Sequence, residues 1–279
     1  MRDVAFGQYY PKDSFIHKLD PRTKLIASVV YIVAIFLCNN YYTYAACFLF
    51  LVMMILGSRI PLKSVLKTVR AVIFVVIITV IINILFYSAE GDRVFWSWWK
   101  LSVTDGGLIF ASKMAMRLLF LVIATSLVTL TTTPMNLTDG LESLMTPLKW
   151  IKFPVHDVAI IMSIALRFIP SFMEEIDKIM MAQKARGAAF DNGGLVKRAK
   201  ALLPVLIPLF VSAFRRADEL AMALDARCYN ATDKRTKMKK LTFTYRDVIA
   251  FILTAIFLTA VILIRMDLLH VFADFGILL

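Results

Sequence analysis

The chain has 279 residues, of which 59% are hydrophobic and 19% are charged. Soluble domains carry about 25% charged residues, and several apolar runs here reach the roughly 20 residues that cross a hydrocarbon core, so the composition excludes an ordinary soluble protein and predicts a polytopic membrane protein. The formal net charge of +12 does not indicate nucleic-acid binding, because an excess of lysine and arginine in a membrane protein marks its cytoplasmic loops.

The predicted membrane spans follow a polar N-terminal segment of 24 residues, which lacks the pattern of a cleaved signal peptide. We expect five spans, at residues 25–38, 42–57, 71–87, 107–130 and 248–264. The first two are short for spans, so flanking residues must help them cross or the helices must pack obliquely.

The basic residues fix the expected orientation. Residues 1–24 contain five lysines and arginines, residues 58–70 contain four, and residues 132–246 contain eighteen, whereas residues 88–106 contain two and residues 267–279 none. A cytoplasmic N-terminus with five spans places every basic-rich segment in the cytoplasm and the C-terminus outside. Trp96, Trp98 and Trp99 then fall on the outer side, where they either sit in the headgroup layer or pack the loop.

The segment 132–246 is too apolar for an ordinary loop and too charged for the bilayer. We interpret it as a cytoplasmic coupling region between the N-terminal spans (residues 1–131) and the last span (residues 247–279). It reads as three helices, at residues 136–148, 155–186 and 195–227, with Gly187 and an Asn-Gly-Gly turn between the last two. In both long helices the charged residues crowd towards the C-terminal end.

The third of these helices carries two further features. Ala213, Ala217 and Ala221 recur every four residues, which either forms a seam for close helix crossing and partner contact or reflects the abundance of alanine in helices. Pro204 and Pro208 each remove a helical hydrogen bond and should kink the helix.

Catalytic chemistry is not apparent. The sequence has no GxxxxGK[ST] phosphate loop, which predicts no ATP binding through that motif, and no catalytic or metal-spaced cluster, since His17, His156 and His270 are isolated. The five spans contain no carboxylate, which argues against a pump or a secondary transporter. Lys113 and Arg117 lie inside the fourth span and either bind a partner's polar group or snorkel.

Four stretches resemble a known family: GQYYPKDSFIHKLDPRTKL (7–25), RLLFLVIATSLVTLTTTPMNLTDGLESLMTPLK (117–149), MSIALRFIPSFMEEIDKIMMAQKARGA (162–188) and LIPLFVSAFRRADELAMALDARCY (206–229). They are similar, in order, to the T component of energy-coupling factor (ECF) transporters, and look closest to the shared-module type. The resemblance implies a non-catalytic scaffold of a vitamin or metal-ion importer. Its implied partners are exchangeable substrate-binding S components in the bilayer and two cytoplasmic ABC-type ATPases, which bind the ATP.

The resemblance also implies that two Ala-Arg-Gly motifs dock into the ATPases, here Ala185-Arg186-Gly187 and Ala226-Arg227-Cys228. Arginine suits this role because its planar fork can grip a carboxylate through two hydrogen bonds. Cys228 replaces the usual glycine, and a cysteine adopts a left-handed helix cap only at a cost of about 1 kcal/mol or more. This puts the cap at Cys228 in question, and not the role of Arg227. The alternatives are a T component dedicated to one substrate and a stand-alone membrane enzyme or carrier.

Overall fold

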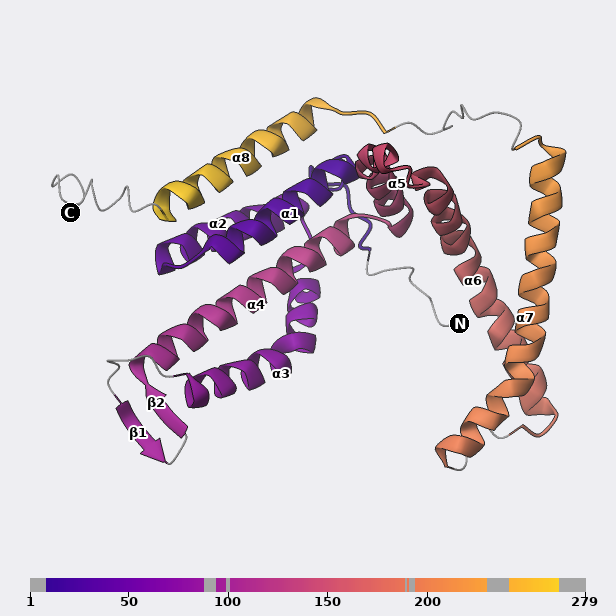
Figure 1. Cartoon of the computed structure of the whole chain (residues 1–279), viewed down its shortest axis with the longest axis horizontal. Coiled ribbons are helices and arrows are strands. Elements are labelled where there is room, and N and C mark those ends of the chain that lie inside the picture. Colours follow the sequence, from indigo (N-terminus) through magenta and orange to yellow (C-terminus); the bar gives the residue numbers. More distant parts are fainter. Residues whose placement is uncertain are drawn as a thin grey trace. The chain divides into compact units, whose positions relative to one another are not determined.

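The computed structural model describes residues 9–87, 94–98, 101–188, 190, 194–229 and 241–265. The prediction of an all-α protein is confirmed. The elements in chain order are α1 Pro21–Leu37, α2 Tyr41–Ser58, α3 Leu62–Phe86, β1 Val94–Trp98, β2 Leu101–Thr104, α4 Asp105–Thr131, α5 Pro134–Leu144, a short 3-10 helix η1 Thr146–Ile151, α6 Val155–Ala185, α7 Leu195–Ala226 and α8 Tyr245–Arg265 (Figure 1).

Five described helices are long and apolar enough to cross a membrane: α2, α3, α4, α6 and α8. Four of these are predicted spans. The remaining predicted span corresponds to α1, which has 17 residues and is therefore shorter than the roughly 20 residues that cross a bilayer unaided. We predicted α6 as a cytoplasmic helix, and that assignment stays a prediction.

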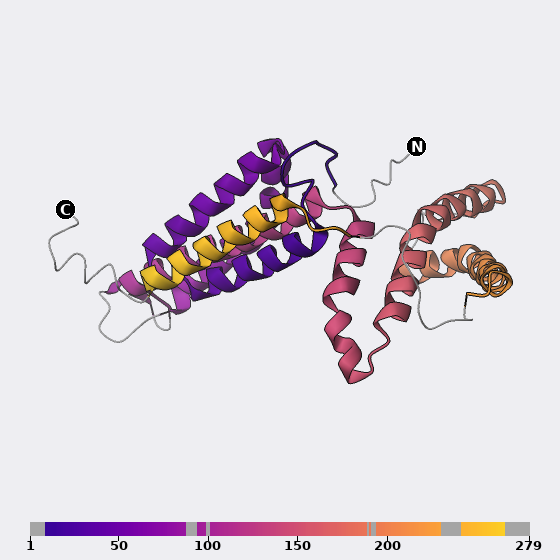
Figure 2. The same cartoon turned by 90° about the horizontal axis from the view of Figure 1, so that it is seen from above.

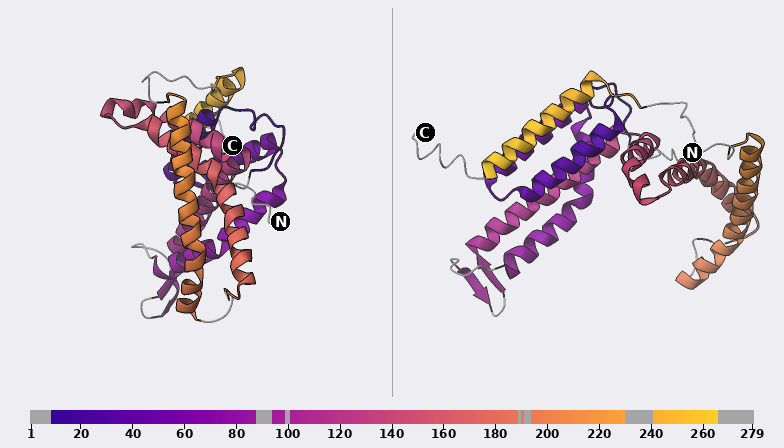
Figure 3. Two further views of the ribbon diagram at one scale, coloured as in Figure 1. Left: turned by 90° about the vertical axis from the view of Figure 1, so that its right-hand side faces the viewer. Right: turned by 45° about the horizontal axis from the view of Figure 1, so that its top comes forward.

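The chain divides into two compact units, residues 5–155 with 242–279 and residues 1–4 with 156–241. We call the first the bundle. In it α1, α2, α4 and α8 run side by side and α3 lies along α4 (Figure 2). Beyond the ends of α3 and α4, the antiparallel strands β1 and β2 pair with Trp96 opposite Val103 (Figure 3), a hairpin that the sequence analysis did not predict.

Aromatic stacking holds the middle of the bundle together. The rings of Phe50 on α2 and Phe257 on α8 lie 4.3 Å apart, and Tyr31 on α1 stacks on both of them. These side chains are buried, and stacked pairs contribute about 0.5–1.5 kcal/mol beyond their area. Packing against α2 and α8 thus holds α1 in place, although the helix is too short to cross a bilayer unaided.

The second unit, which we call the helical pair, consists of α6 and α7. Each begins and ends within a residue of the predicted bounds. α7 continues through Pro204 and Pro208 as one helix of 32 residues, and the expected kink stays a prediction.

Candidate functional site: two capped helix ends and the contacts that hold them

The first tripeptide forms the C-terminal cap of α6. The N–H of Gly187 donates to the carbonyl of Lys184 at 3.0 Å, and the N–H of Ala188 donates to the carbonyl of Gln183 at 3.0 Å. Gly187 has a φ of +86°, the left-handed conformation that glycine adopts without cost. Together these features define a Schellman motif, and Arg186 occupies its cap position.

The second tripeptide ends α7 in the same way. The N–H of Cys228 donates to the carbonyl of Asp225 at 2.9 Å, and the N–H of Tyr229 donates to the carbonyl of Leu224 at 3.0 Å. Cys228 has a φ of +52°. The left-handed cap, which was in question because this residue is not glycine, is therefore present. The two backbone hydrogen bonds satisfy carbonyls that the helix end would otherwise leave open, which offsets the cost of about 1 kcal/mol for a non-glycine residue there. Arg227 therefore occupies the same position as Arg186.

Both ends are open to a partner. All six residues of the two tripeptides are exposed. Within the described part of the chain, neither Arg186 nor Arg227 has a hydrogen bond or ion pair through its side chain. A guanidinium at a helix C-terminus also complements the partial negative charge there. Each end thus presents five unused donors.

The two tripeptides do not come together in one site. α7 begins shortly after α6 ends, and the second tripeptide lies at the far end of α7 (Figures 1 and 3). Gln183, three residues before Arg186, bonds the carbonyl of Pro204, and the 23 residue steps of α7 from Pro204 to Arg227 span about 35 Å at 1.5 Å per residue. The helical pair therefore presents two similar and widely separated cationic ends.

One arginine holds the two long helices to each other. Arg216 on α7 donates from Nη1 to the hydroxyl of Ser171 at 2.5 Å and from Nη2 to the carboxylate of Glu175 at 2.9 Å. Its guanidinium also lies over the ring of Phe172, 5.5 Å from the centroid. This clamp was not predicted from the sequence. Its only signal was the pair of neighbouring arginines on one helix and of neighbouring glutamates on the other.

The alanine stripe and the prolines are largely accessible. Ala213 is half-buried, whereas Ala217 and Ala221 are exposed. The carbonyl of Pro204 accepts a hydrogen bond from Gln183 at 3.4 Å, and Pro208 is exposed. Arg216 faces α6, and the three alanines lie beside it on α7, at the edge of the contact between the two helices. Their role as a crossing seam stays a prediction.

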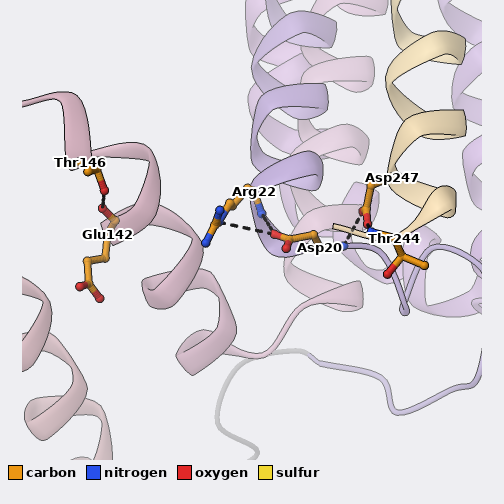
Figure 4. A network of polar contacts seen from close by, with 6 residues as sticks. All are labelled: Asp20, Arg22, Glu142, Thr146, Thr244 and Asp247. Atoms are coloured by element: carbon orange, nitrogen blue, oxygen red, sulfur yellow. Dashed lines mark hydrogen bonds and ion pairs between the residues drawn. The ribbon is translucent and has the colours of Figure 1, made fainter. Parts of the chain in front are cut away.

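A polar junction closes the end of the bundle where α1 begins. The side chain of Asp20 caps α1 by accepting from the N–H of Arg22 at 2.9 Å. The buried carboxylate of Asp247, in the first turn of α8, accepts from the N–H of Asp20 and from the N–H of Thr244, both at 2.8 Å (Figure 4). A buried carboxylate that accepts backbone donors on two segments ties those segments together.

Lys24 and Gly140 extend this junction to α4 and α5. The ammonium of Lys24 donates to the carbonyl of Thr131 at 2.9 Å and to the hydroxyl of Thr132 at 3.3 Å, at the C-terminal end of α4. A Cβ on Gly140 of α5 would lie 2.9 Å from the Cβ of Pro21, so only glycine permits this approach. Much of residues 7–25, the first stretch that resembles the family, therefore forms contacts that hold the helices of the bundle together.

Near that joint, burial lowers the pKa of His17. Its ring bonds the hydroxyl of Ser14 at 2.7 Å and the carbonyl of Tyr10 at 3.0 Å. Because the ring is half-buried beside the ammonium of Lys24, the neutral form is favoured. The histidine thus orders the loop before α1. Among the described residues no group of three or more His, Cys, Asp or Glu side chains gathers.

The two cations of the fourth predicted span meet aromatic rings. Lys113 lies 5.5 Å from the ring centroid of Tyr41, and Arg117 lies 5.6 Å from that of Phe36 while donating to the carbonyl of Cys38 at 3.3 Å. Both cations are thus held by contacts within the bundle, and the choice between snorkelling and binding a partner's polar group is not decided by them. Trp99 and His270 lie outside the described residues.

Comparisons with known proteins agree on one family. Residues 12–238 match the model of the cobalt transport protein family, CbiQ. The chain is similar to the "Energy-coupling factor transporter transmembrane protein EcfT" of Ruminiclostridium cellulolyticum, with 50% identity over 265 residues that cover 95% of this chain and 98% of the relative. It is similar to the proteins of the same name from Clostridium kluyveri (47% identity, 95% and 98% covered) and Bacillus subtilis (44%, 88% and 92%).

Proposed function

The chain belongs to the cobalt transport protein family, whose relatives here are membrane components of energy-coupling factor transporters, and on that premise we propose that it is the scaffold subunit of an ABC-type importer of vitamins or other micronutrients. In this role it is not an enzyme. It passes ATP-driven motion from two cytoplasmic ATPases to a substrate-binding S component in the membrane.

The observation that carries the proposal is the pair of matching helix ends. Two exposed arginines occupy the same position of the same capping motif. About 35 Å of α7, from Pro204 beside the end of α6 to Arg227, lies between them. Such a spacing suits two partner subunits, one for each end, better than one site gripped by both arginines. A carboxylate in a groove of each ATPase would match the planar fork of the guanidinium.

A scaffold must also carry force between its ends. The clamp of Arg216 on Ser171, Phe172 and Glu175 joins α6 to α7 midway between the two tripeptides. Motion imposed at one arginine is then transmitted to the other long helix, because the crossing is held by hydrogen bonds and an ion pair and not by apolar contact alone.

The S component would meet the outer face of α7. Ala217 and Ala221 are exposed, as are the neighbouring large side chains Phe210 and Phe214. Small residues between bulky apolar ones allow another helix to approach closely. In the cell membrane we place the N-terminus in the cytoplasm and the C-terminus outside, from the distribution of basic residues.

Co-purification tests this function. The tagged chain, extracted from membranes of its own cells, should bring down two ATPases together with several different S components. A single S component would indicate a dedicated T component. Recovery of the chain alone, with ATP hydrolysis that a point change in the chain abolishes, would overturn the scaffold in favour of an independent enzyme or carrier.

A further inference from the structure

A short turn ends the bundle just before the helical pair begins. It consists of η1 and the two residues that follow it, with the sequence TPLKWIKF (146–153), and we call it the tip. The bundle ends two residues later, at residue 155. The tip combines apolar and aromatic residues with two lysines, carries no carboxylate, and contains no residue of the two docking tripeptides.

Large apolar side chains of the tip are exposed together. Trp150 is 96% exposed and Ile151 is 80% exposed, and Leu148 and Phe153 beside them are 39% and 40% exposed. Apolar residues scattered singly over a surface are ordinary, whereas a contiguous group of them marks a surface that contacts something other than water. The tip is therefore an interaction surface.

Backbone hydrogen bonds fix the shape of the tip. The N–H of Leu148 donates to the carbonyl of Met145 at 2.9 Å, and the N–H of Phe153 donates to the carbonyl of Leu148 at 3.4 Å. The N–H of Val155 donates to the carbonyl of Phe153 at 2.8 Å. The exposed side chains thus project from an ordered turn.

The position of α5 sets the depth of the tip in the membrane. α5 runs across the end of the bundle where α1 begins, and not along the bundle helices (Figures 1 and 2). Gly140 on α5 packs on Pro21, the first residue of α1, and the charged residues Asp20 and Arg22 on either side of Pro21 mark where the apolar part of the bundle ends. Because α5 lies crosswise, η1 at its C-terminal end stays near this depth, which is the boundary of the hydrocarbon core.

The chemistry of the tip fits a lipid headgroup layer at that depth. Tryptophan is enriched where headgroups meet acyl chains, and a lysine can bury its stem there while its ammonium reaches the phosphates. Two lysines without a carboxylate also complement anionic lipids. A partner protein would cover the tip only in an assembled complex, whereas lipid surrounds the bundle at all times.

We propose that the tip is an interfacial anchor. It inserts Trp150 and Ile151 at the boundary between headgroups and acyl chains, and it prefers anionic phospholipids. On the orientation proposed above, this is the cytoplasmic leaflet. Because the tip directly precedes the boundary between the two units, the anchor fixes the depth at which α6 leaves the bundle. It depends only on a bundle that spans the membrane, and not on the docking of ATPases.

Depth-dependent fluorescence quenching of the full chain in phosphatidylcholine vesicles that contain phosphatidylglycerol tests the anchor. The chain has four tryptophans, so Trp96→Phe, Trp98→Phe and Trp99→Phe together leave Trp150 as the sole tryptophan. Phosphatidylcholine brominated close to the headgroup should quench Trp150 more strongly than phosphatidylcholine brominated close to the chain ends.

Leu49→Trp, in a chain whose own four tryptophans are replaced by phenylalanine, is the matched control. Leu49 is 74% exposed in the middle of α2, so the deep bromines should quench this tryptophan more than the shallow ones. Quenching of Trp150 by neither lipid would place the tip in water, and stronger quenching by the deep bromines would place it in hydrocarbon. Either result would overturn the proposal. The measurement is repeated with the subunits that co-purify with the chain, where loss of lipid quenching would mean that a protein covers the tip, which also overturns it.

The preference for anionic lipid is tested with bromines at one depth on two headgroups. Brominated phosphatidylglycerol should associate with the surroundings of Trp150 more tightly than brominated phosphatidylcholine, as measured from quenching at increasing mole fractions. Lys152→Gln should lower the ratio of the two association constants about fivefold, as expected for one lysine at an anionic surface. A ratio of one in the wild type, or the same ratio in the variant, would refute this preference.

Discussion

Gly187→Ala tests whether the cap of α6 depends on its backbone conformation. Gly187 has a φ of +86°, and a Cβ built on it meets nothing within 4 Å. A steric clash is therefore absent, and the whole effect comes from placing an L side chain in the left-handed region. That cost is about 1–2 kcal/mol, which corresponds to a factor of about 5–30 in an equilibrium constant.

Amide hydrogen exchange of the full chain measures this cost directly. The N–H of Ala188 is held by the carbonyl of Gln183 only while the cap is formed. Gly187→Ala should therefore speed the exchange of this amide by about 5–30-fold. Cys228→Gly provides the matched change at the second cap. It removes the same kind of cost, so the amide of Tyr229, held by Leu224, should exchange more slowly.

The opposite signs make the comparison decisive. If Gly187→Ala leaves exchange of the Ala188 amide unchanged, or Cys228→Gly accelerates exchange of the Tyr229 amide, the two helix ends do not share one capping motif. The two helix ends would then not be structurally equivalent.

Three further predictions concern the contact between the two long helices and the polar junction of the bundle. Arg216→Ala and Glu175→Ala, whose side chains are 33% and 23% exposed, should show a coupling of about 1 kcal/mol in a double-mutant cycle of thermal unfolding; additive effects would mean that the clamp contributes nothing. Asp247→Asn should lower the free energy of unfolding by about 1–3 kcal/mol, because its amide NH₂ cannot accept from a buried N–H; an unchanged unfolding temperature would contradict the junction. Burial lowers the pKa of His17 below its ordinary value, so its contribution to stability is present above about pH 6.5 and is lost as the pH falls through the folded pKa; His17→Gln should remove this loss, and an identical pH profile in wild type and variant would exclude it.

The features that the sequence predicted are those encoded locally. Apolar runs located α2, α3, α4 and α8, and the charge-rich ends of the two long helices located Arg186 and Arg227 within a residue of each helix terminus. A cap, however, is set by backbone hydrogen bonds that residue type only biases. The glycine rule therefore gave the wrong expectation at Cys228, where two such bonds hold a left-handed cysteine.

The features that the sequence did not predict join residues far apart in the chain. Arg216 meets Glu175 across 41 positions, and the backbone of Asp20 meets Asp247 across 227. The free thiols of Cys38 and Cys47 lie 3.4 Å apart in the bundle, although their spacing suggests no site. Such contacts depend on which helix faces pack together, and periodicity in a single sequence does not specify the partner.

The central claim, that the two arginines dock two ATPases, is tested most directly by pull-down of the ATPases with Arg186→Ala, Arg227→Ala and the double variant. Removing one partner of a buried charge pair costs about 2–5 kcal/mol, and sites separated by about 35 Å of α7 should act additively. Each single variant should then retain a weakened complex, lysine at either position should restore binding only in part, and the double variant should release the ATPases and abolish vitamin uptake. Full assembly and uptake in the double variant would contradict the account.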